Sequence, residues 1–372
     1  MKILFISHSF PPILGGVESQ NYNLSKYLKK LAEVKVLANT KGKSWLPIFV
    51  PITFLKALFS MSQYDACLLG NGVLAPLGAV LKIFYPAKRF VSVVHALDIT
   101  YCHKKGFLPF VYRHVNIPSL KRLHKLIMVG NFTIDEAVQV GIKREKCVFI
   151  PNGVVVEDFK ENHTREELSK LFGEDTANKK VILRLGRFVP HKGTSWFIGH
   201  VMPNLPEEIV MIATGYRVKK RTAGDPDNFE KCQEAIEKNN LQKRVRLLPT
   251  LPQRDLKVLL NTADLVVAPN IKIPGSSEGF GINVIEAGAC ECIVVASELE
   301  GLKDAIKDGE NGFLVESGNA EKWVQKIEAI FSAGDDFRKQ FGVRAAQFVR
   351  DNYSWDKIAG RYVEELEKVI NK

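Results

Sequence analysis

The sequence predicts an α/β protein made of two domains, each built on a doubly wound parallel sheet. Short runs of apolar and β-branched residues alternate along the chain with amphipathic helical patterns. This alternation is typical of parallel sheets that helices cover on both faces. It restarts once near the middle of the chain, and 372 residues are too many for one ordinary core but suit two.

The first half of the chain supplies the first sheet. Helical patterns lie between its apolar runs, such as Val17, Leu24, Leu28 and Leu31 on one helical face. The expected strands are Ile3–Ser7, Val34–Leu37, Ala66–Leu69, Phe90–His95, Leu126–Val129 and Val148–Ile150. We expect residues 1–165 to form an N-terminal Rossmann-like domain.

The second sheet begins after a charged stretch, residues 157–180, which has the composition of a surface linker with a short helix. Its expected strands are Val181–Leu185, Val210–Ala213, Val245–Leu248, Leu265–Ala268, Ile293–Ala296 and Phe313–Val315. We expect residues 176–353 to form a second Rossmann-like domain, followed by a last helix over residues 355–372. Ligands of open parallel sheets bind beyond the carboxyl ends of the strands, so a site is expected in the loops there.

The charge of the chain is unevenly distributed. Residues 1–150 contain 20 Lys and Arg against 7 Asp and Glu, whereas residues 151–372 contain 32 against 34. The net charge of +11 therefore comes from the first half. A basic half of this kind suits nucleic acid, anionic lipid head groups or a phosphorylated ligand, and solubility alone is the simpler explanation.

Cysteine usage and the first residues predict a cytoplasmic protein. The six cysteines are scattered, with no Cys-x-x-Cys pair and no histidine at metal-binding spacing, as in a reducing compartment. Residues 1–7 are expected to be a strand and not a signal peptide, because they run into Pro11-Pro12 without a small-residue cleavage site. No uncharged apolar run reaches the roughly 18 residues of a membrane span, so we expect any membrane contact to be peripheral.

Two loops that follow first strands carry glycines. Gly15-Gly16 precedes a helix that begins near Val17, where backbone N–H groups can approach an anion, although a structural turn explains a glycine pair about equally well. The equivalent loop of the second half, residues 186–193, reads Gly-Arg-Phe-Val-Pro-His-Lys-Gly. Its two cations, Arg187 and Lys192, come directly after a strand, so both can reach one pyrophosphate.

A pair of carboxylates gives the most specific signal. Residues 274–287 read Pro-Gly-Ser-Ser-Glu-Gly-Phe-Gly-Ile-Asn-Val-Ile-Glu-Ala. Glu278 lies in a glycine loop and Glu286 lies in the first turns of the helix that follows. Two carboxylates at this spacing can hold hydroxyl groups at two points along one extended ligand.

This segment resembles the Glu-x7-Glu signature of the retaining glycosyltransferases of family four, which have the GT-B fold of two Rossmann-like domains facing each other across a cleft. The resemblance covers nearly the whole chain. Further matching segments are Gly15-Gly16-Val17-Glu18, Phe90–Asp98, Pro151-Asn152-Gly153-Val154 and Tyr353-Ser354-Trp355. The last of these begins the C-terminal helix, which in this fold crosses back to the first domain.

The resemblance implies transfer of a sugar, with retention of configuration, from a UDP- or GDP-sugar. Glu286 would hold the ribose hydroxyls and Glu278 a hydroxyl of the sugar, while Arg187 and Lys192 neutralise the departing diphosphate. His95 would lie beside the sugar, although a histidine at a strand end is more often a structural hydrogen-bonding residue. The implied catalytic residues are His95, Arg187, Lys192 and Glu278. The implied donor-binding residues are Gly15, Gly16, Gly186, Arg187, Lys192, Glu278, Gly279, Phe280, Gly281 and Glu286.

Three segments depart from the family pattern. They are Glu291, Glu298-Leu299-Glu300-Gly301 and Leu248-Pro249-Thr250. Because these positions bear on base and phosphate preferences, the sequence does not identify the donor nucleobase.

No metal or organic cofactor is expected, and the nucleotide sugar is a co-substrate. The single Asp-x-Asp, Asp225-Pro226-Asp227, follows a basic run and precedes a helical pattern, which favours a turn and helix cap over a cation site.

Residues 101–125 mix basic and large apolar side chains, which suits the surface of an anionic membrane. In the GT-B fold the first domain holds the acceptor, so we expect a glycan or lipid-linked acceptor at the inner face of the membrane. The alternative is an ordinary amphipathic helix whose aromatic residues face the core. The predicted surface residues are Lys104, Lys105, Arg113, Lys121, Arg122 and Lys125.

Other classes of protein fit less well. A Rossmann dehydrogenase would need Gly-x-Gly-x-x-Gly after Ile3–Ser7 and an acidic residue after Val34–Leu37, and the sequence has neither. A nucleic-acid-binding protein would use the basic half but leaves the carboxylate pair without a purpose. A non-catalytic protein that binds a nucleotide sugar remains an alternative, although every matched site residue is present.

Overall fold

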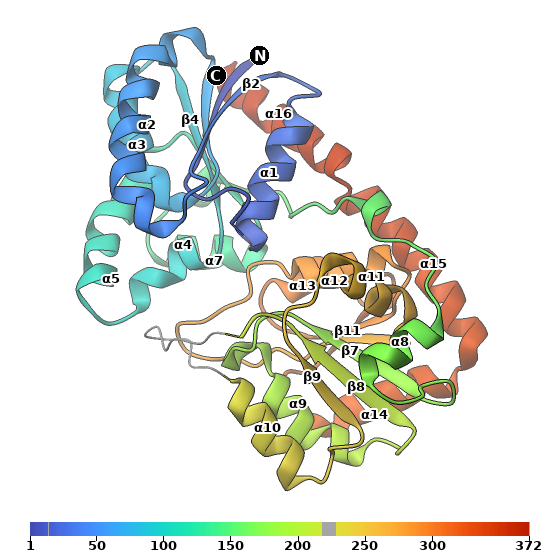
Figure 1. Cartoon of the computed structure of the whole chain (residues 1–372). Helices are drawn as coiled ribbons and strands as arrows, with labels where there is room; N and C mark the ends of the chain where they lie inside the picture. The colour runs from blue at the N-terminus through green and yellow to red at the C-terminus, as the bar shows by residue number, and fades with distance from the viewer. Residues whose placement is uncertain (14, 218–227, 372) are drawn as a thin grey trace. The chain divides into compact units, whose positions relative to one another are not determined.

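The computed structural model describes residues 1–13, 15–217 and 228–371 of the chain. The chain divides into two compact units, Met1–Gly153 with Tyr353–Lys372, and Val154–Asn352. Within the described residues each unit contains one six-stranded parallel sheet with helices packed around it (Figure 1). The predicted fold class is confirmed.

The sheet of the first unit has the strand order β2-β1-β3-β4-β5-β6. All six expected strands form, with ends within two residues of those predicted: β1 (Lys2–Ser7), β2 (Glu33–Ala38), β3 (Ala66–Leu69), β4 (Arg89–Val94), β5 (Lys125–Met128) and β6 (Cys147–Phe149). The order reverses between β1 and β3, where Ile6 pairs with Leu69. At such a switch point the loops leave the sheet in opposite directions and open a crevice for a ligand.

The sheet of the second unit has the order β12-β11-β10-β7-β8-β9. Its strands are also those expected: β7 (Lys180–Leu185), β8 (Ile209–Thr214), β9 (Val245–Leu248), β10 (Leu265–Ala268), β11 (Val294–Ser297) and β12 (Phe313–Val315). Its switch point lies between β7 and β10, which pair through Ile182 with Leu265 and Leu183 with Val266. The loops after β7 and β10 therefore flank the expected ligand site.

Helices cover both sheets. In the first unit they are α1 (Gly16–Leu28), α2 (Leu46–Ser60), α3 (Ala75–Phe84), α4 (Leu97–Thr100), α5 (Phe107–Val111), α6 (Ile117–Arg122), α7 (Asn131–Gln139) and α16 (Trp355–Ile370). The second unit has α8 (Arg165–Phe172), α9 (Thr194–His200), α10 (Phe229–Lys238), α11 (Gln253–Thr262), α12 (Ile282–Ala289), α13 (Leu302–Ala305) and α14 (Ala320–Ser332). Helix α15 (Gly334–Tyr353) leads from this unit into the first.

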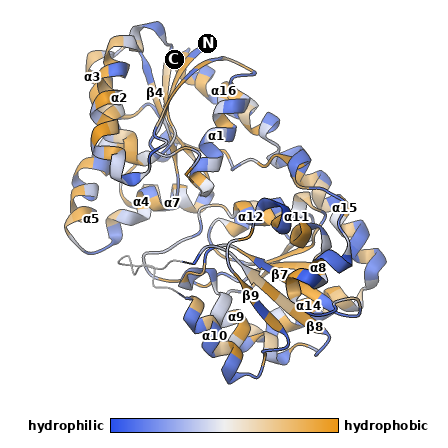
Figure 2. Cartoon of the chain, in the orientation of Figure 1, coloured by the Kyte–Doolittle hydropathy of each residue, from blue (hydrophilic) through white to orange (hydrophobic). Residues whose placement is uncertain are grey.

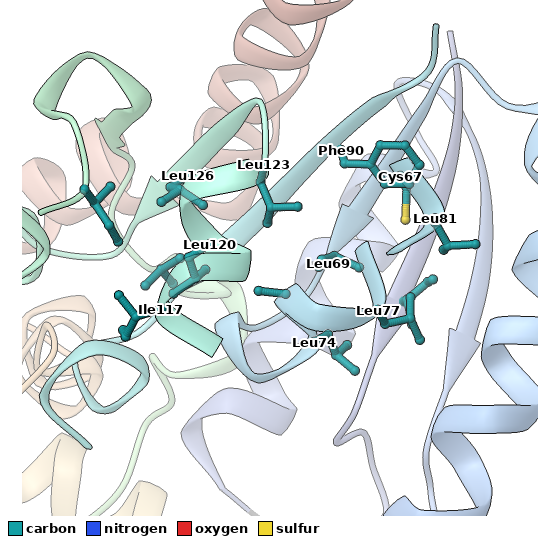
Figure 3. Close-up of a cluster of buried hydrophobic side chains, with 14 of the residues drawn as sticks. Cys67, Leu69, Leu74, Leu77, Leu81, Phe90, Ile117, Leu120, Leu123 and Leu126 are labelled. Atoms are coloured by element: carbon teal, nitrogen blue, oxygen red, sulfur yellow. The ribbon is translucent and has the colours of Figure 1, made fainter. Parts of the chain in front are cut away.

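Each unit has its own apolar core. In the first unit, Leu77 and Leu81 of α3 and Leu120 of α6 pack with strand residues such as Leu69 and Leu126 (Figure 3). In the second unit the core includes fully buried aromatic residues, among them Phe197, Trp323 and Phe341. Burying these side chains supplies the main driving force for folding each sheet against its helices.

The C-terminal helix α16 packs against α1 in the first unit. Its first residue, Trp355, is 2% exposed and stacks on Tyr27 with ring centroids 6.3 Å apart. A Cβ atom on Gly153 would lie 2.6 Å from the Trp355 ring, so only glycine fits there. Two segments matched to the family, residues 151–154 and 353–355, thus meet in one packing contact.

Among the described residues, one helical segment meets the length and composition of a membrane span. It covers Lys43–Gln63 and includes α2, and 22% of its most apolar window is buried. The segment has no uncharged apolar run of 18 residues, because Lys56 interrupts it. Length and composition alone do not establish that the segment crosses a bilayer.

Candidate functional site

The loop after β7 brings two predicted cations to the switch point of the second unit. It runs from Gly186 through a 3₁₀ turn (Pro190–Lys192) to Gly193, where α9 begins. Gly193 has φ +67°, and a Cβ atom there would lie 1.7 Å from the carbonyl oxygen of Pro269 in the loop after β10. The two loops therefore touch at backbone level, which requires this glycine.

Lys192 and Glu278 form an ion pair that joins these loops. Their side chains are 13% and 14% exposed, and Asn270 donates a further hydrogen bond of 3.2 Å to Glu278 Oε2. Burial alone would raise the pKa of Glu278, but the charge and hydrogen bond of Lys192, with smaller effects of His191 and Asn270, lower it overall. Glu278 is therefore a carboxylate at neutral pH, ready to accept hydrogen bonds from hydroxyl groups.

The loop that carries Glu278 is held by the segment that departs from the family pattern. The backbone N–H of Glu278 donates to Glu300 Oε2 at 2.6 Å, and the N–H of Gly301 donates to the carbonyl of Glu278 at 3.2 Å. A Cβ atom on Gly301 would lie 2.3 Å from the carbonyl oxygen of Gly279. Glu300 and Gly301 thus fix the backbone around Glu278, a positioning function that their sequence did not reveal.

Glu286 lies on α12, near the same edge of the sheet. Helix α12 is tied to β7 by Asn283, whose side-chain amide donates to the carbonyl of Leu185 at 3.2 Å. Burial raises the pKa of Glu286 to about 7. Among the described residues none forms a hydrogen bond or ion pair with its carboxyl group, which leaves it available to a ligand. Of the other predicted donor residues in this loop, Phe280 is 1% exposed and Gly281 caps α12 with φ +91°.

Arg184, which the sequence reasoning missed, lies beneath the loop of Arg187. It is 1% exposed, and its guanidinium donates to the carbonyls of Gly186 and Arg187, the latter at 3.1 Å. Burial lowers the pKa of Arg184 to about 10, so it remains a cation at neutral pH. The sequence feature that could have identified Arg184 is its position inside the apolar run of β7, a strand buried on both faces, where a charged residue is unusual.

His191, also missed, links the loops after β7 and β10. A hydrogen bond of 2.8 Å joins its Nδ1 to Ser276 Oγ, and its carbonyl accepts from the N–H of Ile271. Burial, followed by the charge of Lys192, lowers the pKa of His191 to about 3. The imidazole is neutral at physiological pH, and it adds no charge beside the two loop cations.

In the first unit, the predicted glycine loop leads from β1 to α1, which begins at Gly16 with Gly15 as its N-cap. A Cβ atom on Gly15 would lie 2.2 Å from the carboxylate of Glu18, which also accepts a hydrogen bond from Ser9 Oγ. A side chain at position 15 would therefore displace the carboxylate of Glu18 from this contact. Gly16 is exposed at the amino end of the helix, where N–H groups face outward.

His95 follows β4 and is held by its own loop. Its backbone N–H donates to Asp98 Oδ2 at 2.9 Å, and Asp98 also accepts from the N–H of Gly72 at 3.0 Å. Burial, followed by the neighbouring His8, lowers the pKa of His95 to about 4, whereas burial raises that of Asp98 to about 6. Within the described part of the chain, His95 Nε2 is buried without a hydrogen-bond partner. A neutral imidazole with an unused ring nitrogen can serve a ligand.

The predicted site residues fall in different units. Gly15, Gly16 and His95 belong to the first, and the loops of Arg187, Lys192, Glu278 and Glu286 belong to the second. In the second unit the ion pair brings Lys192 and Glu278 together, and Gly186 lies beside them, since a Cβ atom there would be 3.9 Å from Lys192 Cε.

The predicted surface residues line one part of the first unit. Arg113 and Lys121 border a pocket of about 390 Å³, and Lys104, Lys105 and Arg113 border a second of about 450 Å³. The alternative in which the aromatic residues face the core is wrong for Phe107 and Phe110, which are 77% and 59% exposed. Lys125 differs from the others because it begins β5 and donates to the carbonyl of Glu145.

The described residues contain no cluster of three His, Cys, Asp or Glu side chains that could hold a metal ion. Asp225 and Asp227 lie outside the described residues. The expectation that no metal takes part therefore stays a prediction.

Known proteins resemble the chain in sequence. Residues 166–348 match the family described as glycosyl transferases group 1. The GPI3 subunit of phosphatidylinositol N-acetylglucosaminyltransferase from Saccharomyces cerevisiae is 26% identical over 331 residues, which cover 82% of this chain and 70% of that protein. A D-inositol 3-phosphate glycosyltransferase from a Mycobacterium species is 30% identical over 166 residues, which cover 45% of this chain and 35% of that protein.

Solved structures resemble the chain in fold. HepE from Anabaena, in complex with UDP-glucose, has a TM-score of 0.75 at 22% identity, with 99% of this chain and 100% of HepE covered. The catalytic domain of starch synthase IV from Arabidopsis thaliana, bound to ADP and acarbose, has a TM-score of 0.78 at 13% identity, with 100% and 99% covered. The chain therefore has the GT-B fold, its residues 166–348 match the glycosyl transferases group 1 family, and these findings together support a glycosyltransferase activity.

Proposed function

We propose that the protein transfers a sugar from a nucleotide-sugar donor, a UDP- or GDP-sugar, to a glycan or lipid-linked acceptor at the cytoplasmic surface of a membrane, with retention of configuration and without a metal ion. The observation that carries this proposal is the buried Lys192–Glu278 pair at the switch point of the second sheet. It combines a cation for a phosphate with a carboxylate for sugar hydroxyls in one place.

The donor occupies the loops after β7 and β10 in this proposal. Arg187 and Lys192 neutralise its diphosphate, Glu278 accepts a hydrogen bond from the sugar, and Glu286 accepts from the ribose. The buried cation of Arg184 adds positive potential beneath the same loop, because a charge acts more strongly in a low dielectric than in water.

The reaction needs charge stabilisation more than acid–base catalysis. The acceptor hydroxyl attacks the anomeric carbon from the face that the diphosphate leaves, the bond from that carbon to the phosphate oxygen breaks, and the departing phosphate takes the acceptor's proton. Because His95 and His191 are neutral, the stabilisation of the departing diphosphate in this scheme falls to Arg184, Arg187 and Lys192. Fixed cations at the diphosphate lower the barrier by stabilising the negative charge that develops there.

The relatives support the choice of substrates. HepE has been solved with UDP-glucose, which favours a UDP-sugar as donor. The name of the GPI3 subunit specifies transfer of N-acetylglucosamine to phosphatidylinositol, which favours a lipid acceptor reached from the membrane surface. The basic residues among positions 104–125 of the first unit carry the charge opposite to that of an anionic membrane surface.

The experiment that tests the proposal is turnover with UDP- and GDP-sugars and lipid extracts as acceptors, with chelator present throughout. We expect one donor to be consumed and the product to carry the anomeric configuration of that donor, read from its proton NMR coupling. An inverted product would contradict retention, and activity restored only by a divalent cation would contradict metal independence. Lack of any turnover together with tight binding of a nucleotide sugar would favour the non-catalytic alternative.

A further inference from the structure

An apolar stripe lies on the solvent side of α2. Ile48, Ile52, Leu55 and Phe59 are exposed, at 44%, 45%, 52% and 79% of their full areas. These positions follow one another at intervals of three or four residues, so the four side chains share one face of the helix. Only Lys56 is charged among residues 46–60.

The opposite face of α2 is buried in the core of the first unit. Phe49, Thr53 and Ala57 are at most 8% exposed, and Val50, Phe54 and Leu58 pack against the same core. The four residues of the stripe are therefore apolar residues beyond those that form the core. A helix that is apolar on all sides is normally buried by protein or by lipid.

The stripe continues onto α3. Phe54 of α2 meets Phe84 of α3 edge to face, with ring centroids 6.4 Å apart, and Ile83 and Phe84 are 70% and 58% exposed. We call the exposed residues Ile48, Ile52, Leu55, Phe59, Ile83 and Phe84 the apolar face. Single exposed apolar residues are common on soluble proteins, but a continuous row on two adjacent helices marks a binding surface.

Helix α5, whose continuing turn contacts α3, adds further exposed aromatic residues. Helix α3 contacts both α2 and the π-helical turn (Tyr112–Asn116) that continues α5, and Figure 2 shows hydrophobic colour over α2, α3 and α5. Phe107 and Phe110 of α5 are 77% and 59% exposed. Aromatic side chains of this kind favour the boundary between lipid head groups and acyl chains.

The charges around the apolar face in the sequence indicate which kind of partner covers it. Residues 43–122 contain 10 Lys and Arg but only 2 Asp and Glu, and one of these two, Asp98, is buried. An apolar face within a strongly basic stretch of chain complements an anionic bilayer, whereas a second copy of the same basic unit would be repelled.

The geometry argues against a helix that crosses the bilayer. The helical segment around α2, Lys43–Gln63, has the length of a membrane span, but the inner face of α2 is committed to the protein core. A helix held in this way can lie only along the membrane, with one face in lipid.

We propose that the apolar face docks the first unit on an anionic phospholipid bilayer, with α2 lying in the plane of the interface and its stripe among the acyl chains. The inference deepens the proposed reaction at a membrane surface and rests on it for the nature of the acceptor. The stripe of α2 lies outside the basic segment 104–125, and it supplies the apolar half of the attachment.

The test is co-sedimentation of the full chain with vesicles of phosphatidylcholine alone and with vesicles in which about a third of the lipid is phosphatidylglycerol. Leu55→Gln/Phe59→Gln changes only exposed positions of the apolar face. Leu31→Gln is the matched control, because Leu31 is 53% exposed but lies in the turn after α1, outside the face. Lys56→Glu reverses the charge within the stripe.

We expect the wild type and Leu31→Gln to bind the anionic vesicles alike, and Leu55→Gln/Phe59→Gln to bind at least about tenfold more weakly. Lys56→Glu should bind less well at low salt and approach the wild type at high salt. Equal binding by the double variant and the wild type would overturn the proposal, as would equal binding to neutral and anionic vesicles. A wild-type dimer that Leu55→Gln/Phe59→Gln turns into monomers would also overturn it, in favour of a second copy.

The binding of a nucleotide sugar in solution separates this inference from the proposed function. The double variant should bind the donor as the wild type does, because the substitutions lie in the first unit on exposed positions. Loss of vesicle binding with donor binding intact supports membrane docking. A wild type that binds vesicles but no nucleotide sugar would contradict the proposed function and leave the docking surface standing.

Discussion

Lys192 and Glu278 neutralise each other at the point where the strand order of the second sheet reverses. Lys192 comes from the loop after β7 and Glu278 from the loop after β10, and both side chains are largely buried. A donor diphosphate at Lys192 would compete with Glu278 for the same cation. The pair therefore links the stability of the site to its affinity for the donor, and substitutions should separate the two.

Lys192→Met should destabilise the protein and inactivate it. The substitution leaves the Glu278 carboxylate largely buried without its cation, and we expect the free energy of unfolding in urea to fall by about 3 kcal/mol. Transfer should slow by a factor of about 10² to 10³, because the diphosphate loses one electrostatic contact.

The double variant Lys192→Met/Glu278→Leu is the control for this pair. An apolar pair of similar volume should restore most of the stability without restoring transfer. A fully active Lys192→Met enzyme would contradict the assigned role of Lys192.

Arg184→Met should weaken the binding of nucleoside diphosphates and spare that of nucleosides. The variant loses the donors that fix the carbonyls of Gly186 and Arg187, and it loses a positive charge beneath the phosphate site. We expect titration calorimetry to show UDP bound about tenfold more weakly, on the scale of one hydrogen bond to a charged group, while uridine is unaffected. Arg184→Lys should recover part of the loss. An equal loss of affinity for UDP and for uridine would show that Arg184 has only a general structural role.

Glu286 should make donor binding depend on pH. Its pKa is raised to about 7 by burial, so the carboxylate form that accepts hydrogen bonds from the ribose becomes dominant only above that pH. We expect the affinity for UDP-glucose, which has no group titrating near neutrality, to increase between pH 6 and about 8. Glu286→Gln should show no such increase.

The same group also makes stability depend on pH. A folded pKa above the ordinary 4.5 means that the native state binds the proton more tightly than the unfolded state between pH 4.5 and about 7. The free energy of unfolding contributed by Glu286 should therefore fall as pH rises through this window. Urea denaturation of the wild type and Glu286→Gln at pH 5 and pH 8 checks this, and a difference between the two proteins that does not change with pH would contradict the raised pKa.

Gly153→Ala should destabilise the first unit by about 2 kcal/mol, because the added methyl group collides with the ring of Trp355, which belongs to a well-packed contact. Gly360→Ala is the matched control, at a position within α16 itself. It has open space for the methyl group, so it should stabilise α16 by up to about 1 kcal/mol. Thermal unfolding measures both. A neutral Gly153→Ala would show that α16 is not anchored through Trp355.

Alternation of apolar runs and helical patterns predicted all twelve strands, because buried parallel strands give the strongest local signal in a sequence. The spacing of Gly186-Arg187 and Lys192 after a strand likewise placed Lys192 at the switch point. The sequence did not predict the roles of Glu300 and His191, because these roles depend on backbone contacts between loops distant in sequence. Arg184 stood out within an apolar strand, but its partners are carbonyl groups, which every residue carries.

The exposed stripe of α2 could not be predicted for a related reason. Its residues have the same apolar character as those of the buried face, and only the packing of α2 on the sheet decides which of them remain in solvent. Sequence patterns show that a helix is apolar, whereas the fold shows which side is covered.

Thermal unfolding can show whether the loops after β7 and β10 bind a nucleotide sugar. The protein is heated without added metal in the presence of UDP-, GDP- and ADP-sugars, NAD(P)H or a short DNA duplex. We predict that one nucleotide sugar raises the midpoint temperature of the wild type and not that of Glu286→Ala. A shift with NAD(P)H or DNA alone would contradict the claim, and Glu278 and Glu286 would then have only structural roles.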